Sequence, residues 1–149
     1  MENEKQISLL NQLVEINNDR LEGYETAAGE TNAADLKMLF GNMKTTSYDN
    51  LQELRSEVMR LGGKPEEGTR VSGKFFRAWM DVKAALTGND RQTVLNSCEF
   101  GEDKALETYK DVLADSATVL SANQLSMVRQ QHANLRADHD RIKALRDAE

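Results

Sequence analysis

Residues 62–88 read GGKPEEGTRVSGKFFRAWMDVKAALTG, and this stretch decides how the rest of the chain can be arranged. It opens with a glycine pair and contains the only proline of the chain, Pro65, and both features favour a break between helices. A structureless connection of 27 residues is improbable in a compact domain. We therefore expect a crossover that contains a short helix, capped by Ser72. The apolar residues of that helix are Phe75, Phe76, Trp79, Met80, Val82 and Leu86.

Two long helical patterns precede the crossover. The first covers about residues 5–28, where apolar residues recur at spacings of three and four, which is the period of one helical face. The second begins after Asn32, which we expect to be its N-cap, and ends at the glycine pair. Because only about three residues separate the two patterns, these helices must form an antiparallel hairpin.

Two further helical patterns follow the crossover. The third helix begins near residues 89–90, and the fourth begins at Ser121, which forms a capping-box pattern with Gln124. The turn between them falls near residues 117–120, so they form a second antiparallel hairpin. Two hairpins joined by one long crossover have the connectivity of ferritin-like bundles. The sequence therefore predicts an all-α, ferritin-like four-helix bundle in which residues 1–149 form a single domain.

The composition agrees with this fold and excludes several classes of function. The chain is 39% hydrophobic and 30% charged, and only 5% of it is aromatic, which favours long helices over sheets. The formal net charge is −6, and no basic stripe indicates nucleic-acid binding. Cys98 is the only cysteine, so no intrachain disulfide is possible. We find neither a signal-peptide pattern nor a membrane-spanning stretch, and we expect a cytoplasmic protein.

Six motifs are distributed along the chain nearly from end to end. They are Leu10-Asn11-Gln12-Leu13-Val14-Glu15, Asp19-x-x-x-Gly23-Tyr24-x-x-Ala27-Ala28, Leu61-Gly62-Gly63-x-Pro65, Arg77-x-Trp79-Met80-Asp81-x-Lys83, Glu99-x-Gly101-Glu102-Asp103 and His139-Asp140-x-Ile142-x-x-Leu145-Arg146-Asp147. Together they resemble a bacterial family of ferritin-like four-helix-bundle proteins catalogued as a domain of unknown function. The resemblance implies the ferritin-like fold, and it supplies no agreed substrate, cofactor or reaction.

The broader resemblance to ferritins can be tested at the positions of a di-iron site. Such sites take one glutamate from each of two helices and a Glu-x-x-His pair from each of the other two. Two iron ions need this set because carboxylates bridge them and an imidazole completes each coordination shell. Glutamates that could serve are present on the first helix and on the third: Glu15, Glu22, Glu25, Glu99 and Glu102.

Both Glu-x-x-His pairs are broken. On the second helix their positions are taken by Ser47 and Asn50. On the fourth helix His132 and His139 lie on the stripe expected to face the core, but an arginine stands three residues before each of them. An arginine near buried carboxylates neutralises them as a metal would. We therefore expect no intact di-iron site and no ferroxidase activity.

The antiparallel register of the third and fourth helices predicts polar pairs in the core. Counting from the turn near residues 117–120 places Glu102 opposite His132, and Glu99 opposite Arg136. Such pairs would satisfy each other and fix the register without a cofactor. The alternative is a degenerate iron, zinc or manganese site. Its ligands would be Glu102, His132 and His139, with Glu25 or Glu22 from across the bundle.

Three functions remain open. The first is a non-catalytic bundle in a structural or stress-related role, which acts without a cofactor as a homo-oligomer (a dimer) or through a protein partner. The second is a metal-binding protein with the degenerate site. The third is an oxygen-handling enzyme like the ferritin-type oxidases, which Ser47 and Asn50 make the least favoured. We interpret Cys98 as a small buried hydrophobic residue and not as a nucleophile.

Overall fold

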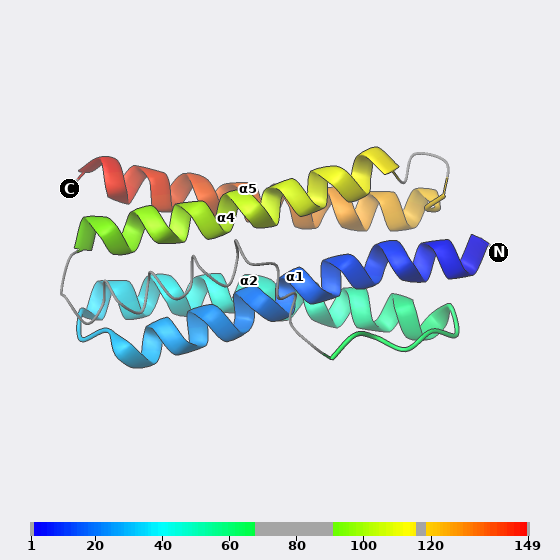
Figure 1. Ribbon diagram of the computed structural model, residues 1–149, viewed down its shortest axis with the longest axis horizontal. Coiled ribbons are helices and arrows are strands. Elements are labelled where there is room, and N and C mark those ends of the chain that lie inside the picture. Colours follow the sequence, from blue (N-terminus) through cyan, green and yellow to red (C-terminus); the bar gives the residue numbers. More distant parts are fainter. Residues whose placement is uncertain (1, 68–90, 116–118, 149) are drawn as a thin grey trace.

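A computed structural model describes residues 2–67, 91–115 and 119–148 of the chain. All regular elements in these ranges are helices (Figure 1). They are α1 (Glu2–Glu30), α2 (Ala34–Arg60), α4 (Arg91–Asp115) and α5 (Ala122–Ala148). The short helix predicted after Ser72 lies outside the described residues, as does the predicted start of the third helix near residues 89–90.

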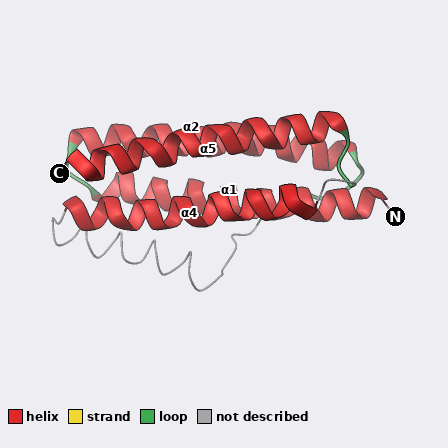
Figure 2. Ribbon diagram, turned by 90° about the horizontal axis from the view of Figure 1, so that it is seen from above, coloured by secondary structure: helices red, strands yellow, loops and turns green. Residues whose placement is uncertain are grey.

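The helices form two antiparallel hairpins, α1 with α2 and α4 with α5 (Figure 1). The hairpins pack so that α1 lies beside α4 and α2 lies beside α5 (Figure 2). Helices α2 and α4 run in the same direction, as expected for hairpins joined by a long crossover. The predicted all-α four-helix bundle is thus confirmed. None of the helices in the described ranges is both long enough and apolar enough to cross a membrane.

The two residues that follow the C-cap of α2 are glycines for two different reasons. Gly62 has a φ of 85°, a left-handed conformation that side chains other than glycine rarely adopt. Its N–H donates to the carbonyl of Met59 at 3.0 Å, while the N–H of Gly63 donates to that of Val58 at 2.9 Å, which is a Schellman ending. At Gly63 the reason is space, because a Cβ atom there would lie 2.7 Å from Cδ1 of Ile7.

Of the two predicted helix caps that lie within the described ranges, one is confirmed and the other is wrong. The N–H of Ser121 donates to Oε1 of Gln124 at 2.9 Å, and the N–H of Gln124 donates to Oγ of Ser121 at 3.1 Å, which is the expected capping box. Asn32, in contrast, is not the N-cap of α2. Ala33 occupies that position and makes no side-chain cap bond. The N–H of Ala33 donates instead to Oγ1 of Thr31 at 3.2 Å.

Asparagines of α1 hold the first residues of the crossover. Nδ2 of Asn11 donates to the carbonyl of Lys64 at 3.1 Å, and its Oδ1 accepts the N–H of Glu66 at 3.0 Å. Nδ2 of Asn18 donates to the carbonyl of Glu66 at 3.2 Å. Because these bonds satisfy backbone groups that no helix or sheet would pair, α1 sets the direction in which the chain leaves α2.

Two hydrophobic clusters fill the bundle, and every helix contributes to both. The buried members of the first are Leu10, Leu13, Val14, Ile16, Leu51, Leu54, Val58, Ala105, Tyr109, Val112, Leu120, Val128 and Leu135. Those of the second are Tyr24, Ala27, Leu36, Leu39, Phe40, Met43, Val94, Leu95, Cys98 and Ile142. On each helix, the residues between the two clusters include a buried or nearly buried polar side chain, so a polar layer divides the core.

Two glycines of the α2 region should respond to alanine in opposite directions. Gly62→Ala should lower the free energy of unfolding by about 1 kcal/mol, because alanine is strained in a left-handed conformation. Gly41→Ala should raise it by about 0.5–1 kcal/mol, because Gly41 lies inside the helix with open space around its Cβ position. Urea titrations followed by circular dichroism measure both values. Equal effects would contradict the assigned end of α2.

Candidate functional site

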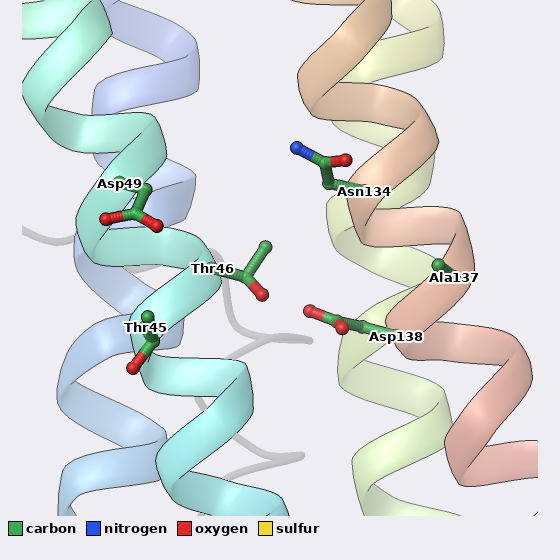
Figure 3. A pocket seen from close by; sticks show the side chains of 6 residues that line it. All are labelled: Thr45, Thr46, Asp49, Asn134, Ala137 and Asp138. Atoms are coloured by element: carbon green, nitrogen blue, oxygen red, sulfur yellow. The ribbon is translucent and has the colours of Figure 1, made fainter.

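A groove lies between α2 and α5 and has a volume of about 260 Å³ (Figure 3). Its lining residues are Thr45, Thr46, Asp49, Asn134, Ala137 and Asp138. Asp138 is only 14% exposed, and its other contacts reach into the core. The groove therefore leads from the surface to the polar layer that divides the two hydrophobic clusters.

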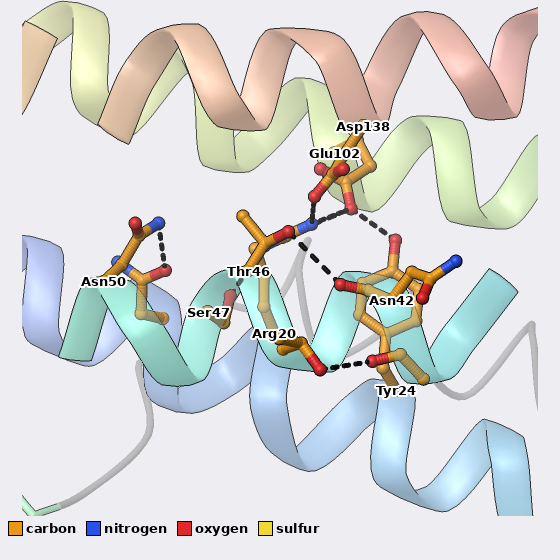
Figure 4. Close-up of polar contacts among 11 residues, drawn as sticks. Arg20, Tyr24, Asn42, Thr46, Ser47, Asn50, Glu102 and Asp138 are labelled. Atoms are coloured by element: carbon orange, nitrogen blue, oxygen red, sulfur yellow. Dashed lines mark hydrogen bonds and ion pairs between the residues drawn. The ribbon is translucent and has the colours of Figure 1, made fainter. Parts of the chain in front are cut away.

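Each helix contributes one side chain to this layer: Arg20 from α1, Ser47 from α2, Glu102 from α4 and Asp138 from α5 (Figure 4). The first three are at most 1% exposed. Every one of them lies between the two hydrophobic clusters on its own helix, which brings them to the same level of the bundle. We call these four residues the ion-pair layer.

The guanidinium of Arg20 lies where the four helices meet. It donates from Nε and Nη2 to Oε1 of Glu102 at 3.2 and 2.6 Å, and from Nη1 to Oγ of Ser47 at 2.6 Å. Nη2 also contacts Oδ2 of Asp138 at 3.3 Å. Tyr24 completes the arrangement: its hydroxyl donates to the same oxygen of Glu102, and the guanidinium lies 5.3 Å from its ring centroid. One cation thus links all four helices.

The pKa values reflect this crowding of charges. Burial opposes the charge of Arg20, but Glu102, Tyr24 and Asp138 outweigh it and raise the pKa of Arg20 above its ordinary value. Burial, with the Glu102 carboxylate as the next cause, raises the pKa of Tyr24 well above its usual range, so Tyr24 remains a neutral donor. Burial also raises the pKa of Asp138, although Arg20 acts against it. The guanidinium of Arg20 is thus the counter-charge of two carboxylates, those of Glu102 and Asp138.

A second, neutral layer lies next to the ion-pair layer and again takes one residue from each helix. Nδ2 of Asn50 donates to Oδ1 of Asn17 at 3.3 Å, and Nδ2 of Asn17 donates to the hydroxyl oxygen of Tyr109 at 2.7 Å. The Tyr109 hydroxyl donates to Oε1 of Gln131 at 2.7 Å, and Nε2 of Gln131 returns to the carbonyl of Asn50 at 3.4 Å. These contacts form a closed ring of hydrogen bonds across the bundle.

Sequence reasoning found three of the residues in these layers and missed the central one. The sequence indicates Ser47 and Asn50 as residues that replace di-iron ligands and Glu102 as a candidate metal ligand, and all three are buried in the layers. Arg20 was overlooked. A signal was available, because Arg20 lies three residues after Asn17 and four before Tyr24, on the same helical face as both. A basic residue on a buried stripe is a strong indication of an internal ion pair.

The predicted pair of Glu102 with His132 is wrong, because Glu102 bonds to Arg20 and Tyr24 instead. His132 is partly exposed and stacks against Tyr109, with ring centroids 6.3 Å apart. Burial, followed by Arg136 and then Lys110, lowers the pKa of His132, so it gains no partner that would favour its charge.

The predicted pair of Glu99 with Arg136 is also wrong. Glu99 pairs with Arg146, and Arg136 contacts Asp140 on its own helix at 3.5 Å. Arg146 lies ten residues, nearly three turns, beyond the predicted partner Arg136. Part of this shift arises because side chains of both helices lean toward their own N-termini, so contacting residues of an antiparallel pair are each about one position farther along the chain than backbone counting suggests.

The predicted metal set of Glu25, Glu102, His132 and His139 is not brought together. Glu25 is exposed, as is Glu22, whereas Glu102 is buried in the ion-pair layer. The histidines lie on the flanks of α5, because its buried stripe runs through Gln131, Leu135 and Ile142.

His139 belongs to another group, which we call the peripheral acidic cluster: Glu99, Asp103 and His139. Ligand atoms of these three residues lie within 4.8 Å of one another. Within the described ranges, this is the cluster of acidic and histidine side chains that is close enough to hold a metal ion. Nε2 of His139 lies 2.7 Å from Oδ1 of Asp103, and Nδ1 lies 3.2 Å from Oδ1 of Asp140. Arg146 already neutralises Glu99, so the cluster has the donor set of a metal site but also an internal cation.

A family model matches residues 5–115 of the chain, and its description is "Domain of unknown function (DUF2383)". The match extends from α1 to the end of α4 and therefore includes Arg20, Ser47 and Glu102. No curated protein matches the chain.

Removing the buried cation should be more damaging than removing both charges. Arg20→Met should lower the free energy of unfolding by about 3–5 kcal/mol, because it leaves the buried Glu102 without a counter-charge. The double substitution Arg20→Met with Glu102→Leu should recover most of that loss, since no charge is then stranded. Urea denaturation of the wild type, Arg20→Met, Glu102→Leu and the double variant gives the coupling energy between the two residues. Purely additive losses would contradict the pair.

The thiol of Cys98 should be unreactive in the folded protein. It is 1% exposed, and burial, with Glu102 as a further cause, raises its pKa above the ordinary value, so little thiolate forms at neutral pH. A chromogenic thiol reagent should therefore label Cys98 only after denaturant is added. Rapid labelling of the native protein would contradict the buried position.

Proposed function

The chain belongs to the family described as a domain of unknown function, DUF2383, and we propose that it is a non-catalytic bundle that acts by association. Its centre is held by an internal ion pair in place of metals. The observation that carries this proposal is the Arg20 guanidinium bonded to Glu102, Ser47 and Asp138 at the meeting point of the helices.

The chemistry of the ion-pair layer argues against a di-iron centre there. A di-iron centre needs several carboxylates to bridge two cations, and a fixed guanidinium among those carboxylates repels both cations. Oε1 of Glu102 already accepts bonds from Arg20 and Tyr24. Ser47 and Asn50 supply neither a carboxylate nor an imidazole from α2. Oxidase chemistry of the ferritin type would have no ligand set to use.

Association is supported by apolar side chains on the outside of the bundle. Among the residues that the structure describes, the exposed large hydrophobic side chains are Met38, Tyr48, Met59 and Phe100. Three of the four belong to α2, where Met38, Tyr48 and Met59 lie within about a quarter of a turn of one another. They are about 15 Å apart along the helix, so they mark one face of α2 without forming a continuous patch. We assign this face of α2 to contact with a second copy of the chain.

The state of association tests this proposal directly. Analytical ultracentrifugation should give a dimer that dissociates when Tyr48 and Met59 are both replaced by glutamate, because charge on an apolar interface is costly. Phe100→Glu on α4 is the matched control and should leave the dimer intact. A monomer at the highest attainable concentration would contradict the assignment to a second copy.

A second candidate function is metal binding at the peripheral acidic cluster. The observation that favours it is the orientation of His139, whose Nδ1 is held by Asp140 while Nε2 faces Asp103. A ligand histidine is typically fixed by a carboxylate on its other nitrogen. One imidazole with two carboxylates suits zinc, manganese or iron. An ion there would have to displace Arg146 from Glu99.

Metal content separates the two candidates. If the cluster binds metal, calorimetric titration of the tag-free protein with Zn²⁺ or Mn²⁺ should show one site, and His139→Ala should abolish it. His132→Ala is the matched control and should leave binding unchanged, because His132 stacks on Tyr109 outside the cluster. No binding to the wild-type protein would reject the second candidate. Metal lost on Glu102→Gln, but kept in His139→Ala, would overturn the proposed ion-paired centre.

A further inference from the structure

Asp138 is the member of the ion-pair layer that water can reach. It lines the groove between α2 and α5, where it points toward Thr46 (Figure 3), and its side chain is 14% exposed. The other members of the layer, Arg20, Ser47 and Glu102, are at most 1% exposed. Asp138 can therefore exchange a proton with the solvent, whereas the rest of the layer is closed to it.

The layer carries a net negative charge when both of its carboxylates are ionised. Nη2 of Arg20 lies 2.6 Å from Oε1 of Glu102 but 3.3 Å from Oδ2 of Asp138, so the cation is bound mainly to Glu102 (Figure 4). Asp138 thus faces a cation from α1 that is already paired and an anion from α4. On its α2 side it meets the neutral Thr46, and Asp49 lines the same groove. A partly buried anion in these surroundings is incompletely compensated.

Glu102 is poorly placed to remove this excess charge by taking up a proton. Its Oε1 atom already accepts hydrogen bonds from Arg20 and Tyr24. Its Oε2 atom is buried without a hydrogen-bond partner among the described residues. A proton on Oε2 would therefore be a buried donor without an acceptor, which is costly.

Asp138, in contrast, has an acceptor for a proton. The hydroxyl of Thr46 donates to the carbonyl of Asn42 at 3.2 Å, and Thr46 is also a hydrogen-bond partner of Asp138. Because a hydroxyl carries a single proton, Thr46 can donate to only one of these two groups when Asp138 is ionised. A protonated Asp138 would donate to the Thr46 oxygen, and Thr46 would keep its bond to Asn42. The protonated state thus makes both hydrogen bonds and the ionised state makes one.

We propose that Asp138 makes the packing of α5 against α2 sensitive to pH: in weakly acidic solution it takes up one proton from water and donates it in a hydrogen bond to Thr46. When the pH rises, this proton returns to water and Asp138 becomes the second anion of the ion-pair layer, which weakens the contact between the two hairpins. This behaviour belongs to a single chain and does not require the dimer.

The sign of the effect on stability follows from where Asp138 binds its proton more tightly. Burial raises the pKa of Asp138 in the folded protein above its ordinary value, although Arg20 opposes this. As the pH rises, the unfolded chain therefore releases this proton before the folded protein does. The stabilisation by protonated Asp138 is complete below the ordinary pKa of aspartate and is lost as the pH rises through the raised value.

Urea denaturation of the wild type and Asp138→Asn from about pH 4 to 8 tests the proposal. Asparagine has nearly the shape of aspartate and is always neutral. The unfolding constant of the wild type, divided by that of Asp138→Asn, should increase with pH by up to about tenfold per pH unit and then level off. A purely structural effect of the substitution would shift this ratio equally at every pH. Asp111→Asn, which removes an exposed carboxylate of α4, is the control and should give a ratio independent of pH.

A second measurement uses only the wild-type chain and so does not depend on the folding of a variant. Carbon-13 NMR of the side-chain carboxyl groups should give a titration midpoint for Asp138 above that for Asp111 in the same sample. A midpoint of Asp138 at or below that of Asp111 would overturn the proposal. An unfolding ratio for Asp138→Asn that stays constant or falls as the pH rises would overturn it as well.

Discussion

The buried contact between Arg20 and Glu102 is the constraint on which the rest of the bundle depends. A guanidinium removed from water must find its partners inside the protein, and here all four helices supply them. The two hydrophobic clusters are therefore placed on either side of the charge, and each helix has to present a polar residue at the same level. The neutral ring of Asn17, Asn50, Tyr109 and Gln131 extends this requirement by one more layer.

Much of the fold could be predicted because local rules determine it. The spacing of apolar residues, the glycine pair at Gly62 and the capping box at Ser121 each report on a few neighbouring residues. The cap at Asn32 was wrong for a related reason: several polar residues compete in a short turn, and backbone geometry gives the role of hydrogen-bond acceptor to Thr31. Such a choice depends on the path of the chain and not on residue type alone.

The site was harder to predict, because it depends on how helices face one another. Ser47 and Glu102 could be identified from their places on helical faces, but their partners could not. The lean of side chains toward the N-terminus of each helix contributes to the shift of the contacts between α4 and α5 from the predicted register. A displacement of one residue on a helix turns a side chain through about 100°, so His139 faces α4 at the flank while Asp138, its neighbour, faces the core.

The division of charge between the hairpins has a consequence for how the halves recognise each other. Within the ion-pair layer, the hairpin of α1 and α2 carries the cation Arg20, whereas the hairpin of α4 and α5 carries the anions Glu102 and Asp138. Two copies of the first hairpin would confront two guanidinium groups, and two copies of the second would confront four carboxylates. Each half is therefore complementary to the other and repelled by itself. The charges therefore favour packing of each hairpin against the other and not against its own copy, even though both are helical hairpins of similar length.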